Sequence, residues 1–147
     1  MSQKKMVEVA NKEIANFNLL YTKLHNYHWF VNGPHFFELH KKLEELYVEI
    51  STHYDELAER LLALGEKPAA TIKQYMELTT LKEATGREST EKMIETVISD
   101  FETVVGELKE GIEFAEEAGD HATGDMFGEM QTSLEKHNWM LKAYLGK

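Results

Sequence analysis

The sequence predicts an all-α fold, a four-helix bundle with one short extra helix in its middle connection. Apolar residues recur at every third or fourth position over four long stretches, which is typical of amphipathic helices. Strong helix breakers separate the stretches, and no stretch alternates as a strand would. At 147 residues, the chain is expected to form one domain, residues 1–147, with a core of its own.

Each element is expected from its own pattern. The first stretch stops at Asn32-Gly33-Pro34, and the second stops at Gly65 with a proline shortly after. A capping box at residues 71–74 opens the short helix, which runs through about residue 78. The third stretch ends near residue 119. The four apolar stripes consist of Met6, Ala10, Ile14, Phe17, Tyr21 and Leu24; Leu39, Leu43, Leu46, Ile50, Leu57, Leu61 and Leu64; Ile94, Val97, Phe101, Val104, Leu108, Ile112 and Ala115; and Met126, Met130, Leu134, Leu141 and Leu145.

Composition excludes several kinds of protein. The formal net charge of −10, from 26 acidic and 16 basic residues, argues against a surface that binds nucleic acid broadly. The absence of cysteine excludes disulfides and thiolate metal sites, so that only histidine and carboxylate ligands remain. The N-terminus has no signal-peptide apolar segment, and no apolar run approaches the roughly 20 residues of a membrane span. We therefore expect a cytoplasmic protein that does not enter a membrane.

The second stretch carries a polar face opposite its leucine stripe. At 100° per residue, His40, Glu44, Asp55 and Glu59 lie at about 100°, 140°, 160° and 200° from the start of that stripe. Apolar and small residues accompany them, which indicates a contact with another subunit rather than an ordinary exposed face. These companions are Phe37, Val48, Ser51 and Leu62.

The four polar residues form two pairs with four-residue spacing, His40 with Glu44 and Asp55 with Glu59. Such a pair can offer two ligands to one ion, although ordinary surface polarity explains any single pair more simply. Glu44 and Asp55 are about 16 Å apart along a helix, too far to share an ion. Both pairs, however, are centred on position 49.5. A two-fold axis there would place each His-Glu pair against the partner's Asp-Glu pair, making two identical metal sites per dimer.

One further ligand candidate lies on the first helix. If this helix runs antiparallel to the second, His28 lies level with His40. Two histidines and up to three carboxylates suit iron, and also zinc or manganese. None of the seven histidines follows a glutamate by three positions, so the intrabundle di-iron motif of larger ferritins is not expected.

These residues lie in two motifs that resemble the Dps proteins, mini-ferritins also known as DNA-binding proteins from starved cells. The first follows the family pattern H-W-x-hydrophobic-x-G-x5-L-H-x3-acidic from His28-Trp29 to Glu44. The second comprises Tyr54-Asp55-Glu56-Leu57-Ala58-Glu59-Arg60, followed by Leu64-Gly65 and Pro68. A weaker likeness reaches His137, Trp139 and the C-terminal segment, so the resemblance spans nearly the whole chain.

The resemblance implies a ferritin-like bundle that assembles into a hollow dodecamer with ferroxidase sites at its two-fold interfaces. His28, His40 and Glu44 would come from one subunit, and Asp55 and Glu59 from its neighbour. The family oxidises Fe(II), preferentially with hydrogen peroxide, stores ferric mineral and so limits oxidative damage. Many members have aspartate at the position of Glu44, and the longer glutamate arm leaves the position of a second iron open.

Four other residues have weaker claims to a role near the iron. Trp29 lies beside the site in relatives, where simple aromatic packing is an equal alternative to a redox role. His25 could touch the site, but a structural or solvent-exposed role is favoured. Asp120 and Asp125 resemble acidic residues that line iron-entry pores at the family's three-fold axes. Helix capping by Asp120, or solvation, is the alternative.

Two other functions compete with iron oxidation. One is the compaction of DNA, which in this family usually depends on flexible tails rich in lysine and arginine. Here the termini offer only a few lysines, and the acidic charge opposes binding, so that weak or absent DNA binding is expected. The other is a structural oligomer that holds zinc or manganese. The common centre of the two pairs argues against an inert interface but does not identify the metal.

Overall fold

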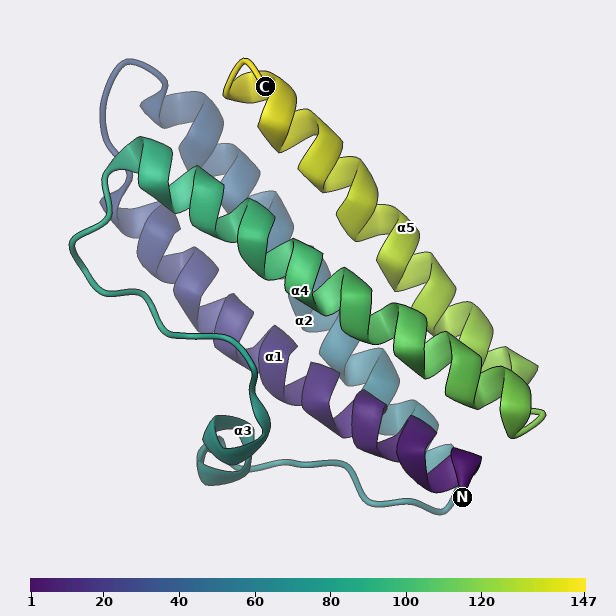
Figure 1. Ribbon diagram of the computed structural model, residues 1–147. Coiled ribbons are helices and arrows are strands. Elements are labelled where there is room, and N and C mark those ends of the chain that lie inside the picture. The colour runs from purple at the N-terminus through teal and green to yellow at the C-terminus, as the bar shows by residue number, and fades with distance from the viewer.

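The computed structural model describes residues 1–147 and contains five helices and no strand, which confirms the all-α prediction. The long helices α1, α2, α4 and α5 lie alongside one another, and α3 lies apart from them on the crossover that joins α2 to α4 (Figure 1). None of the helices combines the length and apolarity that a bilayer crossing requires. The helices span Ser2–Phe30 (α1), Phe36–Ala63 (α2), Ile72–Leu78 (α3), Thr90–Glu117 (α4) and His121–Tyr144 (α5).

The helix ends lie where the sequence predicts them. Gly65 has a φ of +78°, a conformation that disfavours other residues, and it turns the chain so that the Glu66 amide donates to the carbonyl of Leu61 at 2.8 Å. The capping box is complete, because Thr71 and Gln74 each accept a hydrogen bond from the other's main-chain amide. Local sequence therefore sets the lengths of the helices.

The core contains 30 buried apolar residues and includes most of the stripe residues of the four long helices, while Tyr21, Leu64, Ile112 and Leu145 are partly buried against it. The stripe predicted for α5 needs one correction. Phe127 is fully buried, whereas its neighbour Met126 is only half-buried. The reason is a close helix contact at Gly111, where an added Cβ would lie 2.8 Å from Val9 and 2.9 Å from Phe127. The absent side chain of Gly111 makes room for the Phe127 ring between α1 and α4.

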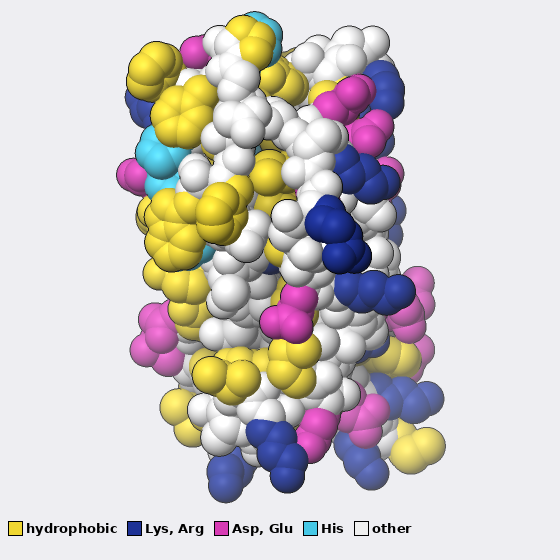
Figure 2. Space-filling view, turned by 90° about the vertical axis from the view of Figure 1, so that its left-hand side faces the viewer, with side chains coloured by type: hydrophobic (Ala, Val, Ile, Leu, Met, Phe, Trp, Pro, Cys, Tyr) yellow, Lys and Arg dark blue, Asp and Glu magenta, His cyan; other side chains and the backbone are white.

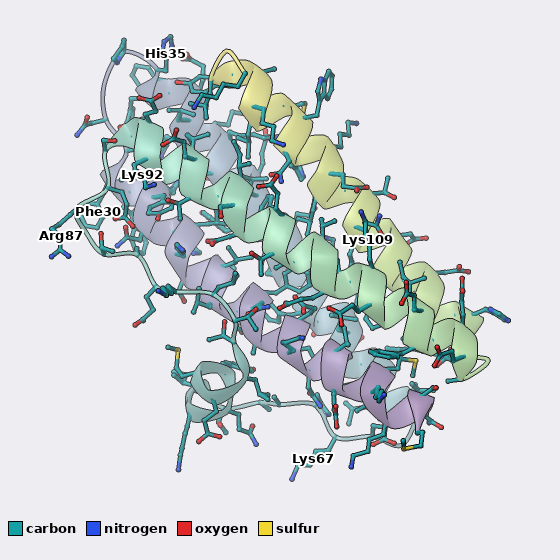
Figure 3. The ribbon with its side chains drawn as sticks, viewed as in Figure 1. Phe30, His35, Lys67, Arg87, Lys92 and Lys109 are labelled. Carbon is teal, nitrogen blue, oxygen red and sulfur yellow. The ribbon has the colours of Figure 1, made fainter.

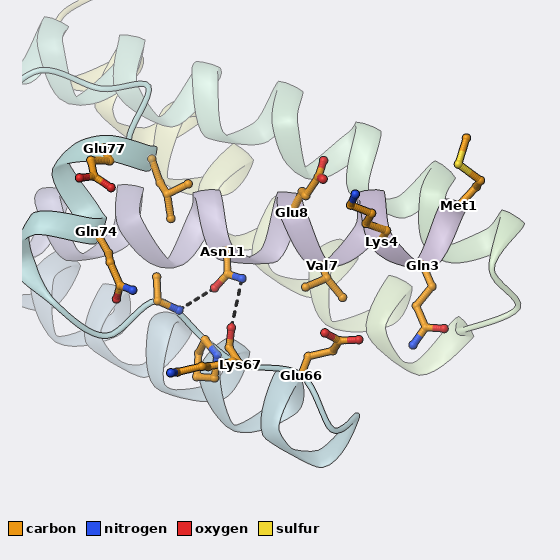
Figure 4. Close-up of a pocket in the computed structure, with 13 residues that line it drawn as sticks. Met1, Gln3, Lys4, Val7, Glu8, Asn11, Glu66, Lys67, Gln74 and Glu77 are labelled. Atoms are coloured by element: carbon orange, nitrogen blue, oxygen red, sulfur yellow. Dashed lines mark hydrogen bonds between the residues drawn. The ribbon is translucent and has the colours of Figure 1, made fainter.

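Side chains of α1 hold the crossover against the bundle. Asn11 donates to the carbonyl of Lys67 at 3.4 Å and accepts from the Ala69 amide at 2.7 Å (Figure 4). Further along α1, Lys23 donates to the carbonyl of Lys82 at 2.6 Å and to Asp100 of α4 at 2.8 Å. Figure 3 shows Lys67 at the start of this crossover. The long connection is therefore fixed by polar contacts as well as by packing.

A buried acidic pair lies under the same crossover. Asn16 donates to Glu13 at 3.1 Å and to Glu107 of α4 at 3.0 Å, and its oxygen accepts from the Thr80 amide at 2.9 Å. Burial, then the hydrogen bond and negative charge of Glu107, raises the pKa of Glu13 well above its ordinary value of 4.5. The Oε2 atom of Glu13 is buried and has no donor within reach, so a charged carboxylate would be left unpaired there. A protonated carboxyl would instead donate a hydrogen bond to Glu107.

Glu13→Gln is expected to reduce the loss of stability at rising pH. Because the pKa of Glu13 is higher in the folded chain, folding above about pH 4.5 requires proton uptake, and stability falls as the pH rises toward the raised value. Glutamine accepts from Asn16 and donates toward Glu107 without a charge. Unfolding midpoints measured from mildly acidic to mildly alkaline pH should change less in this variant. Glu8→Gln, at an exposed position of α1, is the control and should follow the wild type. If the unfolding midpoints of Glu13→Gln and of the wild type changed in parallel with pH, Glu13 would not be the group with the raised pKa.

Candidate metal centre

His28 and His40 face each other across the α1–α2 turn. Their rings are stacked, with centroids 3.7 Å apart and planes tilted by 13°. The Nδ1 atom of His28 lies 2.7 Å from the main-chain oxygen of His40, and the Nδ1 atom of His40 lies 2.8 Å from the main-chain oxygen of His28. The prediction that the two residues lie level with each other is confirmed. The reciprocal contact between them was not predicted.

This contact selects one tautomer for both imidazoles. A carbonyl oxygen can only accept a hydrogen bond, so each Nδ1 carries the proton and donates it. In the neutral ring, Nε2 then keeps its lone pair, which is the form that binds a metal ion. A metal-binding histidine typically has its other nitrogen held in this way, because the contact orients the ring. The main-chain contacts thus leave both Nε2 atoms available to a metal ion or to a hydrogen-bond donor.

Glu44 lies beside the imidazoles, one turn after His40 on α2. Its Oε1 atom is 4.0 Å from Nε2 of His28. The His28 side chain is only 7% exposed, whereas that of Glu44 is 55% exposed. Tyr47 contacts the His28 ring edge-on, with centroids 5.4 Å apart, and closes the side toward the bundle. One chain therefore places His28 beside both His40 and Glu44 where the bundle meets its outer surface.

Asp55 and Glu59 lie on the same outward face of α2 but away from this group. Both are exposed. The eleven residues from Glu44 to Asp55 correspond to about 16 Å of helix. Within one chain, no three side chains of histidine, cysteine, aspartate or glutamate are arranged to hold a metal ion. The two groups of candidate ligands thus lie apart from each other in one chain, His28, His40 and Glu44 in the first and Asp55 and Glu59 in the second.

Large apolar side chains surround both sets without being covered. Phe37 is 80% exposed, Leu62 is 61% exposed and Val48 is 54% exposed, all on the outward face of α2. Phe30, at the end of α1, also projects from the bundle beside the α1–α2 turn (Figure 3). In the space-filling view, histidine and hydrophobic side chains gather along one edge of the molecule (Figure 2). Exposed aromatic and aliphatic groups around polar ligands are typical of a surface that another chain covers.

The two residues predicted near the site belong to an aromatic group behind it. The Nδ1 atom of His25 lies 2.9 Å from the main-chain oxygen of Tyr21, and its ring stacks on Tyr47 with centroids 3.7 Å apart. Trp29 contacts the His25 ring at 5.2 Å and remains exposed on its other side. Burial, then the negative charge of Glu44, raises the pKa of Tyr47. These contacts give His25 a packing role next to the candidate ligands.

The structure favours a structural role for one of the two candidate pore residues. Asp120 caps α5, because its carboxylate accepts from the Thr123 amide at 3.0 Å, and it pairs with Arg60 at 3.0 Å. Burial alone would raise the pKa of Asp120, but the contacts with Thr123 and Arg60 lower it. Asp125 is exposed in the second turn of α5. Its role in a pore stays a prediction.

A polar cluster inside the bundle was missed by the sequence analysis. The Glu49 carboxylate of α2 accepts from Nε2 of His53 at 3.0 Å, from Nε2 of His137 at 2.9 Å and from the Ser133 hydroxyl at 2.6 Å. Burial alone would raise the pKa of Glu49, but these hydrogen bonds outweigh it and hold the pKa far below its ordinary range. The four-residue spacing of Glu49 and His53 is the feature of the sequence that could have indicated this cluster. His137 is thus hydrogen-bonded within this cluster.

Comparisons with known proteins agree with this architecture. The ferritin-like domain family matches residues 7–147. General stress protein 20U of Bacillus subtilis (strain 168) is 52% identical over 141 residues, which cover 96% of this chain and 97% of that protein. The crystal structure of Dps from Staphylococcus aureus is 49% identical with a TM-score of 0.95, covering 97% of this chain and 96% of that one.

A further solved structure concerns a Dps that was exposed to a metal. It is the structure of Dps from Listeria innocua soaked with 10 mM zinc. That protein is 39% identical to this chain, with a TM-score of 0.93, and the match covers 97% of each of the two chains. The likenesses extend over nearly the full length of every chain compared and include both the helical architecture and the sequence. The protein therefore belongs to the Dps family of ferritin-like proteins.

Proposed function

We propose that the protein is a ferroxidase and iron store that oxidises Fe(II), preferably with hydrogen peroxide, at sites between subunits. It keeps the ferric product as mineral inside a dodecameric shell and so protects the cytoplasm from oxidative damage. The observation that carries this proposal is the reciprocal His28–His40 contact, which leaves the Nε2 lone pairs of both rings free, that of His28 at 4.0 Å from the Glu44 carboxylate. A hydrogen bond from the other ring nitrogen is what usually orients a metal-binding histidine.

The second half of each site comes from the partner chain. Asp55 and Glu59 are exposed on the same face of α2 as His40 and Glu44, and both pairs are centred on position 49.5. A two-fold axis through that point brings each imidazole pair against the partner's two carboxylates. The exposed Phe37, Val48 and Leu62 supply the apolar area that such a contact needs.

The ligand types suit both oxidation states of iron. Imidazole nitrogens hold Fe(II), and the three carboxylates of a completed site favour the harder, more highly charged Fe(III), so that binding energy assists the loss of the electron. The same set accepts zinc or manganese, which we expect to compete with iron. The Glu44 carboxylate lies 4.0 Å from Nε2 of His28, and its longer arm leaves the position of a second iron open.

Replacement of one ligand from each half tests the site assignment. His40→Ala combined with Asp55→Ala should abolish the fast phase of Fe(II) oxidation by peroxide, because each substitution removes a ligand. The measurement is anaerobic loading with Fe(II), followed by peroxide in a stopped-flow instrument, with particle size checked in parallel. The matched control replaces exposed residues of the same helix, Glu38→Ala with Glu45→Ala, and should react like the wild type. An unchanged fast phase in the first variant would disprove the assignment.

DNA binding by the protein itself is expected to be weak or absent. A dodecamer would carry a charge of about −120, twelve times the −10 of one chain, which repels phosphates. The few terminal lysines repeated twelve times could add only weak avidity. Removal of Fe(II) and peroxide would nevertheless protect DNA without contact.

A further inference from the structure

The turn between α1 and α2 is tied to the start of α4. Thr90 is the first residue of α4, which begins beside this turn (Figure 1). The main-chain amide of Asn32 donates to the Thr90 hydroxyl oxygen at 3.2 Å, and that hydroxyl donates to the carbonyl oxygen of Asn32 at 2.8 Å. One hydroxyl therefore occupies both main-chain groups of a single turn residue. Below, these two hydrogen bonds are called the Thr90 clamp.

The Thr90 clamp lies where the helical hydrogen bonds of α1 end. In an α-helix each amide donates to the carbonyl four residues earlier, so the Asn32 amide would donate to the His28 carbonyl if α1 continued. The series instead ends one residue earlier, where the Val31 amide donates to the carbonyl of Tyr27 at 2.9 Å. Because Thr90 accepts the next amide, the His28 carbonyl has no donor from its own helix.

That carbonyl is the acceptor on which the His40 ring depends. The Nδ1 atom of His40 donates to it at 2.8 Å, and this contact leaves the Nε2 lone pair of the ring free. The opposite contact differs, because the His28 ring donates to the carbonyl of His40, which lies within α2. The position of that acceptor does not depend on the end of α1. The two imidazoles are thus held by different means, and only the His40 ring depends on the turn.

We propose that Thr90 is a positioning residue for the metal centre. Its hydroxyl holds the Asn32 amide away from the His28 carbonyl, so that this carbonyl remains available to the Nδ1 proton of His40. Without the hydroxyl, the freed amide can extend α1 by one residue and donate to the His28 carbonyl in place of His40. The His40 ring can then carry its proton on Nε2, and that nitrogen has no lone pair left for a metal ion. The consequence for iron rests on the proposed function, whereas the tautomer of His40 is a property of the metal-free protein.

Removal of the hydroxyl with little change in shape tests this role. Thr90→Val replaces the hydroxyl with a methyl group and abolishes both hydrogen bonds. The assembled metal-free protein, isotopically labelled at the histidine nitrogens, is studied by nuclear magnetic resonance at mildly alkaline pH, where histidine rings are neutral. Signals are assigned by their loss in His28→Gln and His40→Gln. The wild type should show His40 protonated on Nδ1, whereas Thr90→Val should show a mixture of both tautomers at His40 and an unchanged His28.

Zinc binding provides a second measurement that needs no oxidation of iron. The assembled metal-free protein is titrated with zinc ions in a calorimeter. Loss of the contact that orients a metal-binding histidine typically weakens metal binding by about 10–100-fold. Because Thr90 acts on the His40 ring only through Asn32, we expect the lower end of this range, a loss of about tenfold in zinc affinity in Thr90→Val.

Two variants serve as matched controls. Thr90→Ser keeps the hydroxyl and should retain both the tautomer and the zinc affinity of the wild type. Thr103→Val removes an exposed hydroxyl from the same helix, one that donates to the Ser99 carbonyl at 3.2 Å. This variant should also behave like the wild type. Size measurements confirm that each variant assembles.

A second substitution distinguishes positioning from a general loosening of the turn. Proline has no main-chain amide hydrogen, so Asn32→Pro removes the donor that would compete with His40. Val31 has a ψ of 143°, within the range that the residue before a proline prefers. The double variant, Thr90→Val with Asn32→Pro, should therefore return His40 to the wild-type tautomer.

The possible results separate this inference from the proposed function. Slow oxidation of Fe(II) by the wild type would contradict the proposed function, but the tautomer of His40 would still decide the role of Thr90. The inference is overturned if Thr90→Val keeps the wild-type tautomer, or if a changed tautomer leaves the zinc affinity unaltered. Equal changes at His28 and His40 that Asn32→Pro does not reverse would also overturn it. Such changes would mean that Thr90 only stabilises the turn.

Discussion

A mixture of two inactive variants should regain about a quarter of the wild-type sites. One variant lacks the imidazoles, through His28→Ala and His40→Ala, and the other lacks the carboxylates, through Asp55→Ala and Glu59→Ala. Each alone should be nearly inactive, because every site in its dimers loses all the ligands that one side contributes. The prediction follows from the two partial ligand sets, which lie about 16 Å apart on α2 and cannot meet within one chain.

The recovery follows from counting the ligands in a mixed dimer. One of its two sites receives His28 and His40 from the second variant and Asp55 and Glu59 from the first, and is complete. The other site has lost both sets. Random assembly from equal amounts makes about half of the dimers mixed, and each has one good site of two. About a quarter of the wild-type fast phase should therefore return after the two variants are unfolded together and refolded.

Two controls make the result decisive. Each variant unfolded and refolded alone should remain inactive, which excludes recovery by refolding itself. Size measurements must show that the mixture assembles as the wild type does. Sites made within a single chain predict no recovery at any mixing ratio. A correctly assembled mixture that stays inactive would therefore show that the symmetry about position 49.5 is coincidental.

Glu49→Ala should be among the most destabilising single substitutions in the chain. The carboxylate accepts three hydrogen bonds, at 3.0 Å from His53, 2.9 Å from His137 and 2.6 Å from Ser133. Its removal leaves the buried His53 and the half-buried His137 and Ser133 without their acceptor between α2 and α5. An unpartnered buried polar group costs about 1–3 kcal/mol, so a loss of about 3 kcal/mol or more in the free energy of unfolding is expected.

The pH dependence of this loss has a definite sign. The pKa of Glu49 is lower in the folded chain than its ordinary value of 4.5. Its stabilisation is therefore complete above that value and declines as the pH falls toward the depressed folded pKa. The difference in stability between wild type and Glu49→Ala should thus be largest near neutral pH and shrink in acid. Denaturant titrations of the subunit at several pH values measure it.

A nearby substitution provides the matched control. Glu45→Ala removes an exposed carboxylate from the same helix and should change stability by about 0.5 kcal/mol or less. A similarly small effect of Glu49→Ala would show that the buried donors find other partners, and that the cluster does not hold α2 to α5.

Patterns in the amino-acid sequence were enough to predict the helices, their ends and the outward face of α2. These properties depend on local rules: apolar spacing, the capping box at Thr71 and the turn at Gly65. The spacing of His40, Glu44, Asp55 and Glu59 also came from the sequence, because a helix converts residue numbers directly into angles and distances. The two motifs then predicted the family that the comparisons show.

The rotation and relative height of neighbouring helices could be learned from the tertiary structure alone. The reciprocal Nδ1 contacts of His28 and His40 depend on the rotation of α1 against α2, and the Glu49 cluster depends on the height of α5 beside α2. Phe127 replaces Met126 in the core because Gly111 lets the helices approach closely. Rotation and height are set jointly by many side chains distant in sequence, so that no local pattern determines them.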